Sequence, residues 1–313
     1  MRIFVAGAGG AVGRRLVPLL VEAGHEVTGT THSPDRTDAV RRLGARPVVM
    51  DAFDAAAVRV AMRDASPDVV VHQMTALSGP QDLRRFDRTF ALTNRLRTEG
   101  TDILLAAARA VGARRFVVQS FTGWTNPRVG GPIKTEDDGF DEHPTDASRE
   151  TLAALRRMES TVEGAADVKG VALRYAFLYG PGTGLTPGGD VLEMIRKRRL
   201  PIVGGGGGVW SFVHVDDAAT ATVAAVGGTA TGVFNIADDE PAPVSQWLPY
   251  LAETIGARRP MRVPAWLVRP MLGEQGVSMM TEIRGSSNAR ARRELGWRPR
   301  YGSWRQGFRE ALG

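Results

Sequence analysis

Three glycines near the start of the chain constrain its fold more than any other feature. Gly7, Gly10 and Gly13 stand at three-residue spacing, directly after an apolar run and at the start of a helical pattern. Glycine at such positions allows a sharp turn, a close approach of the backbone to a pyrophosphate, and tight packing of a helix on a strand. Unpaired N–H groups at the helix N-terminus then bind the phosphates. The pattern therefore predicts a dinucleotide-binding strand–turn–helix unit.

Short apolar runs alternate with helical patterns through the first half of the chain. Each run is apolar almost throughout, as expected for strands of a parallel sheet that is covered on both faces. The predicted strands are Arg2–Ala6, Glu26–Thr30, Arg46–Met50, Asp68–His72, Arg114–Gln119 and Val168–Arg174. The repeated strand–helix–strand spacing predicts an α/β fold, a doubly wound parallel sheet of the Rossmann type.

The pattern of predicted strands and helices changes after Gly180, where Gly/Pro-rich loops separate shorter elements. We expect residues 1–180 to form the dinucleotide-binding domain, with 213–238 returning to it. Residues 181–313 should then mainly form a smaller C-terminal substrate-binding lobe.

Composition excludes several classes of protein. The 313 residues contain no cysteine, which rules out disulfides, zinc–thiolate sites and cysteine nucleophiles. No uncharged apolar run approaches the roughly 18 residues that span a bilayer, and no signal peptide precedes the first strand, so we expect a cytoplasmic protein with no membrane partner. The net charge is +6, but basic and acidic residues are interspersed, so no nucleic acid partner is expected. No His/Asp/Glu grouping has metal-ligand spacing, so no metal is predicted.

The end of the second predicted strand indicates which cofactor binds. An acidic residue there would hold the ribose 2′-hydroxyl of NAD, yet no carboxylate stands at this strand tip. Instead His32, Ser33 and Arg36 can bind a 2′-phosphate. This favours NADP(H), with NAD(H) as the alternative. Asp51 is placed to meet the adenine amino group, and further residues expected along the cofactor are Ala11, Val12, Ala52, Gln73, Met74 and Thr75.

Motifs along nearly the whole chain carry a family resemblance. Besides the glycines they are Asn94 with Gly100-Thr101, Arg115–Ser120, Leu173-Arg174, Tyr179–Gly182, Phe212–Ala218, Phe234–Ile236 and Leu295–Pro299. In this order they resemble the extended short-chain dehydrogenase/reductase family, also described as NAD-dependent epimerases/dehydratases. The resemblance implies a Rossmann core, cofactor contacts from Asn94 and Gln119, and a homodimer built on helices 84–111 and 148–163.

One part of the family pattern is missing. Members normally use a Tyr-x-x-x-Lys pair, in which the Lys and the cofactor lower the Tyr pKa so that the phenol exchanges a proton with substrate. Here the Tyr position holds Thr151 and the Lys position holds Leu155, and no tyrosine in the chain is followed by Lys four residues on. We interpret the chain as an atypical member without this acid–base pair.

Other polar side chains are candidates for the missing chemistry. Ser120 and Thr122 follow the fifth strand, where a hydroxyl would donate a hydrogen bond to a substrate carbonyl; capping of backbone is the alternative. Tyr175, at the end of the sixth strand, is a further catalytic candidate. His214 is a candidate substrate contact, and Trp124 is a candidate wall of the pocket.

One residue that differs from the family pattern, Trp210, indicates the class of substrate. Relatives that act on nucleotide-sugars commonly hold the diphosphate with an Arg where this chain has Trp210, and an indole offers one donor and no charge. With Trp124 and Phe177 it predicts a pocket for an apolar or aromatic small molecule. The function we expect is NADP(H)-dependent hydride transfer on a carbonyl or hydroxyl. Three alternatives stay open: a nucleotide-sugar epimerase or dehydratase, in which Arg196–Arg199 would grip phosphate; a redox-inert NAD(P)-binding regulator; and non-redox chemistry beside a structural cofactor.

The polar loop before Ser148 also has two interpretations. Glu136–His143 lies in a Pro/Gly-rich stretch, which suits a lid over the substrate. A solvated acidic loop is the alternative.

Overall fold

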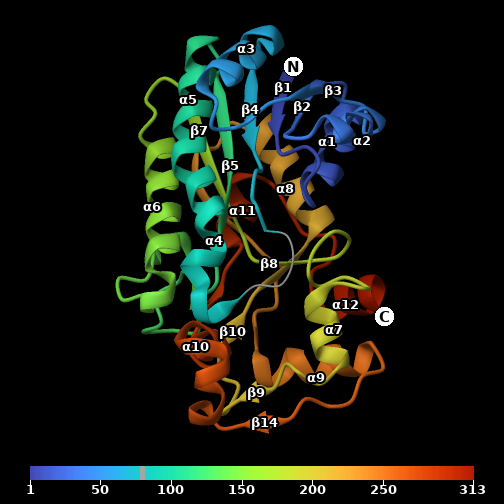
Figure 1. Ribbon diagram of the computed structural model, residues 1–313, viewed down its shortest axis with the longest axis vertical. Coiled ribbons are helices and arrows are strands. Elements are labelled where there is room, and N and C mark those ends of the chain that lie inside the picture. Colours follow the sequence, from blue (N-terminus) through green and yellow to red (C-terminus); the bar gives the residue numbers. More distant parts are fainter. Residues whose placement is uncertain (78–81) are drawn as a thin grey trace.

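The computed structural model describes residues 1–77 and 82–313, and its centre is one parallel sheet of seven strands (Figure 1). The strand order is β12-β7-β5-β4-β1-β2-β3, and every neighbouring pair runs parallel. The strands are β1 (Arg2–Ala6), β2 (Glu26–Thr31), β3 (Arg46–Val49), β4 (Val69–His72), β5 (Arg115–Phe121), β7 (Lys169–Tyr175) and β12 (Gly232–Ile236). The order confirms the prediction of a doubly wound α/β sheet of the Rossmann type.

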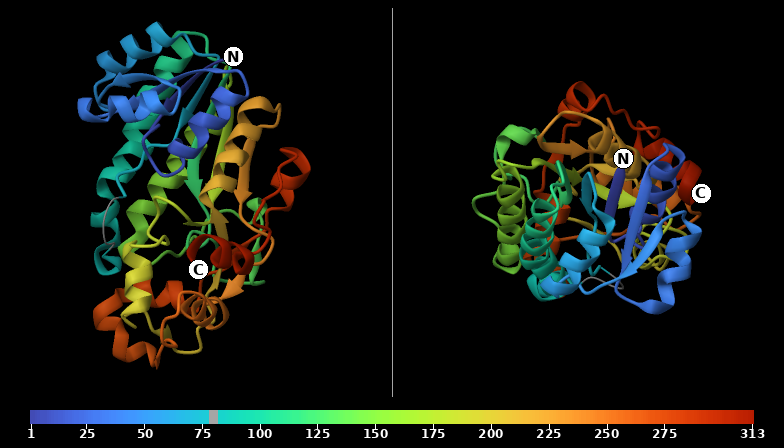
Figure 2. Two further views of the ribbon diagram at one scale, coloured as in Figure 1. Left: turned by 90° about the vertical axis from the view of Figure 1, so that its right-hand side faces the viewer. Right: turned by 90° about the horizontal axis from the view of Figure 1, so that it is seen from above.

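Helices cover both faces of this sheet, as Figure 2 shows from the side and from above. One face packs against α3 (Ala55–Ala65), α5 (Thr101–Ala110) and α6 (Arg149–Glu163), and the other against α1 (Gly13–Glu22), α2 (Thr37–Arg42) and α8 (Val215–Gly227). Side chains alternate along each strand, so Phe4 joins the first core while Ile3 and Val5 join the second. Burial on both faces explains why the central strands β1, β4, β5 and β7 are mostly apolar, whereas β2 carries threonines and the edge strand β3 is only partly buried.

The helical pattern predicted over 84–111 is interrupted in the structure. α4 (Phe86–Arg95) and α5 are joined by a π-helical turn, Leu96–Gly100. The turn lies beside the carboxyl end of β4, where His72 contacts the backbone carbonyl of Leu96 at 3.2 Å. Such π-helical turns within helices occur frequently at functional sites.

Most of the remaining elements form the second lobe below the sheet in Figure 1, while α11 packs against β12 at the sheet itself. The strands of this lobe are short and paired, because glycine-rich turns separate them. The elements are β6 (Ile133–Lys134), β8 (Phe177–Tyr179), α7 (Asp190–Arg196), β9 (Ile202–Val203), β10 (Val209–Trp210), β11 (Phe212–His214), β13 (Ala242–Pro243), α9 (Val244–Thr254), β14 (Arg262–Val263), α10 (Ala265–Thr281), β15 (Gly285–Ser286), α11 (Ala289–Glu294) and α12 (Trp304–Leu312). Between β11 and β13 the chain returns to the sheet and adds α8 and β12 to it.

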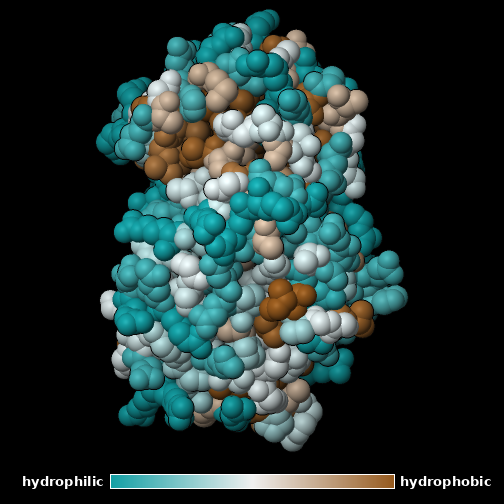
Figure 3. Space-filling model, turned by 180° about the vertical axis from the view of Figure 1, so that it is seen from behind, coloured by the Kyte–Doolittle hydropathy of each residue, from teal (hydrophilic) through white to brown (hydrophobic). Residues whose placement is uncertain are grey.

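The outer surface is mostly polar. Figure 3 shows the face opposite that of Figure 1, where apolar residues gather in separate areas between polar ones. The largest exposed apolar side chains include Trp266 and Met271 on α10. Within residues 1–77 and 82–313, no helix is both long and apolar enough to cross a membrane.

Candidate active site

The glycine turn after β1 has the geometry that a pyrophosphate requires. Gly7 has a φ of +95°, and a Cβ on Gly13 would lie 2.3 Å from the Gly7 carbonyl oxygen. The Gly10 N–H donates to that same oxygen at 3.1 Å, which closes the turn. Val12 precedes α1 without a side-chain cap. The Arg14 and Arg15 N–H groups donate to the carbonyls of Gly10 and Val12, whereas among the described residues the N–H groups of Ala11, Val12 and Gly13 have no partner and can meet a ligand. These residues fit the dinucleotide that the sequence predicts.

The polar residues predicted for the ribose lie together at the end of β2. His32 and Arg36 are exposed and Ser33 is half-buried, with the Ser33 N–H donating to Thr31 Oγ1 at 3.2 Å. Across the described residues Arg36 forms no ion pair, so its guanidinium is available to an anion. At the end of neighbouring β3, the exposed Asp51 accepts the Phe53 N–H at 2.9 Å, and Ala52 is buried beside it.

The structure corrects the expected role of Tyr175. Its side chain is fully buried on the α8 face of the sheet, where its hydroxyl accepts from Gln73 Nε2 at 3.0 Å and lies 2.6 Å from Thr222 Oγ1. Burial raises the pKa of Tyr175 to about 12. Tyr175 is thus a core residue that holds Gln73, and it cannot meet a substrate.

The structure also argues against the expected role of His214 as a substrate contact. Its Nδ1 accepts the Asp216 N–H at 3.2 Å and so caps the start of α8. Its ring is buried between Tyr179 and Tyr301, with centroid distances of 5.1 and 4.4 Å. The imidazole supports the Tyr179–Gly182 turn instead of lining a substrate pocket.

The hydroxyls of Ser120 and Thr122 are also committed to the protein. Ser120 Oγ donates to Glu159 Oε1 at 2.5 Å, and Glu159 forms a buried two-hydrogen-bond ion pair with Arg174 at 2.7 and 2.9 Å. Thr122 Oγ1 donates to Asn126 Oδ1 at 3.1 Å. Because each hydroxyl has only one hydrogen, neither retains a donor for a substrate oxygen. The structure thus gives both hydroxyls a structural role, and their catalytic role stays a prediction.

α6 places the two positions of the missing acid–base pair beside α4. Thr151 Oγ1 accepts from Asn94 Nδ2 at 2.9 Å and donates to Asp87 Oδ1 at 2.6 Å, while Leu155 is fully buried in the core. The nearby His72 is neutral, because burial lowers its pKa to about 4. Thr151, Leu155 and the neutral His72 are therefore not acids that supply a proton near neutral pH.

Aromatic side chains line up across the same region. Trp124 and Phe177, both predicted from the sequence, are joined by Phe121, which stacks on Trp124 at 5.9 Å and meets Phe177 edge-on at 5.2 Å. The run continues at one end with Phe177–Trp210 at 3.8 Å, and at the other with Trp124–Phe86 at 5.0 Å and Phe86–Phe90 at 4.3 Å. We call this set the aromatic run. Phe86, Trp124 and Trp210 are buried, whereas Phe90, Phe121 and Phe177 are half-buried and keep part of their ring surface exposed.

Trp210 uses its single donor inside the protein. The indole Nε1 donates to the Met279 carbonyl at 2.8 Å and the side chain is buried. It therefore offers a ring face and no polar group, which does not suit a diphosphate.

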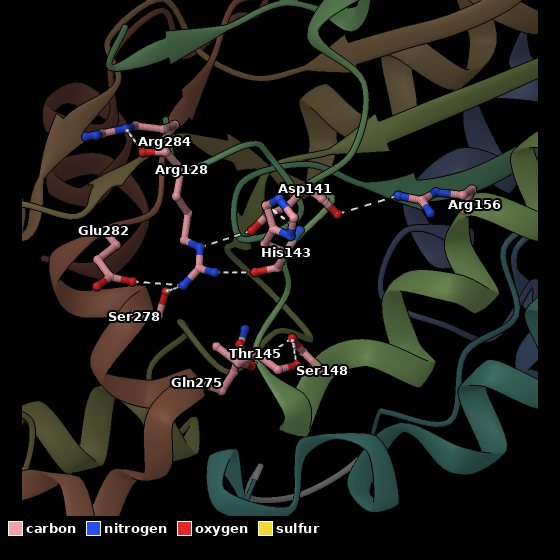
Figure 4. A network of polar contacts seen from close by, with 10 residues as sticks. All are labelled: Arg128, Asp141, His143, Thr145, Ser148, Arg156, Gln275, Ser278, Glu282 and Arg284. Atoms are coloured by element: carbon pink, nitrogen blue, oxygen red, sulfur yellow. Dashed lines mark hydrogen bonds and ion pairs between the residues drawn. The ribbon is translucent and has the colours of Figure 1, made fainter. Parts of the chain in front are cut away.

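The loop between β5 and α6 is fastened to α10, as Figure 4 shows. Arg128 bonds to Asp141 at 3.0 Å and to Glu282 at 2.9 Å, while Thr145 Oγ1 donates to Gln275 Oε1 at 2.6 Å. These contacts hold the loop in place. They disfavour the interpretation of this loop as a lid, which was one of the two expectations.

Three predicted cofactor contacts lie next to the aromatic run. Met74 and Thr75 follow β4 and are half-buried, and Gln119 is half-buried in β5. The Met74 N–H donates to His72 Nδ1 at 3.2 Å, which fixes the chain direction after the strand.

Comparison with known proteins identifies the family. The sequence profile of the NAD dependent epimerase/dehydratase family matches residues 3–237. The chain belongs to this family. The resemblance inferred from the motifs is thereby confirmed.

Two relatives of the chain are named as reductases. The chain is 44% identical over 311 residues to a 3-diazoavenalumate denitrifying reductase from a Streptomyces species, covering 98% of this chain and 99% of that one. It is 30% identical over 272 residues to a 2-alkyl-3-oxoalkanoate reductase of Stenotrophomonas maltophilia (strain K279a), covering 83% of this chain and 77% of that one. The chain is accordingly an NAD(P)-dependent oxidoreductase of the reductase type, as expected.

Solved structures of the family share the fold. A UDP-glucose 4-epimerase from Thermotoga maritima, solved with UDP-glucose, superposes with a TM-score of 0.78 at 23% identity, over 99% of this chain and 97% of that one. A human epimerase family protein solved with NADPH gives a TM-score of 0.77 at 19% identity, over 99% of both chains.

Sequence reasoning missed three features of the site. In the sequence, Phe121 is only the residue between Ser120 and Thr122. The aromatic candidates Trp124 and Phe177 could have indicated that Phe121 belongs with them. Phe86 and Phe90 looked like ordinary helix residues. The third is Arg97, which is buried in the π-helical turn after α4. Nothing in the sequence indicates that this arginine is buried.

Proposed function

We propose that the protein is an NADPH-dependent reductase of a small aromatic molecule, and that the group it reduces is a diazo group in its diazonium form. The observation that carries this is the pair Thr151 and Leu155 in the positions of the missing acid and its lysine. A diazo substrate is suggested by the 44% identical relative, whose name describes reduction of a diazo compound with loss of nitrogen.

The chemistry explains why no acid is needed. When bound, the nicotinamide supplies a hydride, and the balance ArN₂⁺ + H⁻ → ArH + N₂ consumes no proton. A ketone, in contrast, becomes an alcohol only if a proton accompanies the hydride, and positioned acids contribute roughly 100- to 10,000-fold to such steps. A site that binds an aromatic ring and lacks the family's proton donor suits the first reaction better.

Residues of the chain then have binding roles. The glycine turn and the open N-terminus of α1 would hold the pyrophosphate, and Ser33 with Arg36 the 2′-phosphate. The aromatic run would take the ring of the substrate and exclude water from it. Trp210, with its donor already used, speaks against the nucleotide-sugar alternative.

Carbonyl reduction is the second candidate, because the 30% identical relative is named as a reductase of 3-oxoalkanoates. In this site the proton would have to come from water or from the substrate.

The proposed reaction has a distinctive pH dependence. With saturating NADPH and 4-carboxybenzenediazonium, we expect equal amounts of NADPH oxidised and N₂ released, above a control without protein. His72, with a pKa of about 4, is neutral above that pH, and Tyr175, with a pKa of about 12, stays protonated below it. Neither group titrates in between, so kcat should be flat from about pH 6 to about pH 9. Absence of N₂, or a rate that follows one titrating group in this window, would count against the proposal.

Arg36 should set the preference for NADPH. Arg36→Ala is expected to weaken NADPH binding about 10- to 100-fold, the usual value of hydrogen bonds to a charged group, and to leave NADH binding unchanged. Fluorescence titration measures both, with Arg63→Ala, an exposed residue on α3, as the control. If wild-type protein binds NADH as tightly as NADPH, the 2′-phosphate argument fails.

A further inference from the structure

Arg97 is a buried cation with very few partners. It lies in the π-helical turn between α4 and α5 and is 7% exposed. Across residues 1–77 and 82–313 its one hydrogen bond runs from Nη1 to Asn94 Oδ1 at 3.3 Å, and it forms no ion pair. Burial lowers the pKa of Arg97 to about 10, so it is charged at neutral pH.

The other buried arginines show how such a charge is normally satisfied. Arg174 makes two hydrogen bonds to Glu159, and Arg115 donates to the carbonyls of Ala225 and Ala230. A guanidinium removed from water without comparable partners is costly. Among residues 1–77 and 82–313, Arg97 has no carboxylate or carbonyl partner comparable to those of Arg174 and Arg115.

Neighbouring residues cannot supply that anion. His72 uses Nε2 for the Leu96 carbonyl and Nδ1 for the Met74 N–H, so it is a neutral ring with both nitrogens engaged. Asn94 gives its amide N–H to Thr151, which donates onward to Asp87. The carboxylate of Asp87 is thereby bound to Thr151, and three hydrogen bonds in series separate it from Arg97.

These contacts place Arg97 at the candidate active site. Through Asn94 it is linked to Thr151, the position of the missing tyrosine. Its Cζ lies 5.9 Å from the ring centre of Phe90, the end member of the aromatic run. A buried cation therefore stands at one end of a line of aromatic rings.

We propose that Arg97 binds the carboxylate of an aromatic acid, which is the substrate of this site. The inference rests on the proposed function, because it assigns the polar end of the same substrate. A guanidinium presents two parallel donors that match a carboxylate, and the aromatic run matches the ring. The bound carboxylate would also neutralise Arg97 and so remove its repulsion of a diazonium cation.

Two probes that differ only in charge test the assignment. In wild-type protein, 4-carboxybenzenediazonium should have a KM about 10- to 100-fold lower than that of 4-methylbenzenediazonium. Arg97→Met, which keeps an apolar stem of similar length, should bring this ratio to about 1. It should raise the KM of the carboxylated probe and, because it removes a repelling charge, lower that of the methyl probe. Arg97→Lys, which retains the charge without the fork, should give an intermediate ratio. Arg109→Met, an exposed residue of α5 paired with Asp167, is the control and should leave the ratio unchanged.

A binding measurement separates this inference from the proposed reaction. Calorimetry of the protein–NADP⁺ complex with trans-cinnamate should show binding that Arg97→Met weakens about 10- to 100-fold, whether or not any diazonium is reduced. Equal effects of Arg97→Met on both probes, or unchanged cinnamate binding, would overturn the proposal. Loss of NADPH affinity with an unchanged probe ratio would overturn it as well, because Arg97 would then serve a cofactor phosphate. If Arg97→Met does not fold, the probe ratio in wild-type protein and in Arg97→Lys decides.

Discussion

Gly10→Asp is expected to abolish the binding of both NADPH and NADH. A Cβ on Gly10 would lie 3.3 Å from the Gly7 carbonyl oxygen, a close contact that requires a small shift of the turn, but its backbone needs no left-handed conformation, so we expect the chain to fold. The carboxylate would stand where the turn and the N-terminus of α1 face the pyrophosphate. Juxtaposed like charges cost several kcal/mol, which corresponds to a loss of affinity of about 100-fold or more. Fluorescence titration of each cofactor measures it.

Two controls accompany this variant. Gly131→Asp adds the same charge at a loop glycine with open space around it and should leave cofactor affinity unchanged. The melting temperature of Gly10→Asp should stay close to that of the wild type without cofactor. Retained cofactor binding by a folded Gly10→Asp protein would mean that the dinucleotide lies elsewhere.

The fold was predictable because its signals are local. The central strands of the sheet are short, mostly apolar runs, since both faces are buried, and the glycine turn requires backbone conformations and close contacts that a side chain would disturb. The Gly13 position illustrates this, since a Cβ there would overlap the Gly7 carbonyl. Such constraints are visible in the residue types themselves.

The catalytic residues were less predictable because hydrogen-bond partners lie far apart in the sequence. Ser120 looks like a free hydroxyl at a strand end until Glu159 on α6 is seen to accept its hydrogen. Tyr175 likewise looks available, but Thr222 on α8 and Gln73 after β4 enclose it. Only packing decides which polar groups remain open to a ligand.

Arg97 could not be singled out for a different reason. The helical pattern over 84–111 indicates one regular helix, and a regular helix does not show which arginine turns inward. The π-helical turn changes the facing of the residues in it, and that turn depends on His72 and the Leu96 carbonyl. The burial of Arg97 is therefore decided by tertiary packing, which the local sequence pattern does not show.

We propose that this site reduces an aromatic acceptor without donating a proton. A matched pair of acceptors tests it, because 4-carboxybenzenediazonium and 4-acetylbenzoate both carry a ring and a carboxylate, and only the ketone needs a proton. Thr151 and Leu155 occupy the acid–base positions of the family, and neither side chain is an acid that can supply that proton near neutral pH.

The decisive measurement is the acceleration of each reaction by the protein over its rate with NADPH alone. We predict that the acceleration for the diazonium exceeds that for the ketone by about 100- to 10,000-fold, the value of the missing acid catalysis. An equal or larger acceleration of the ketone would contradict the account and would show that the site does possess a proton donor.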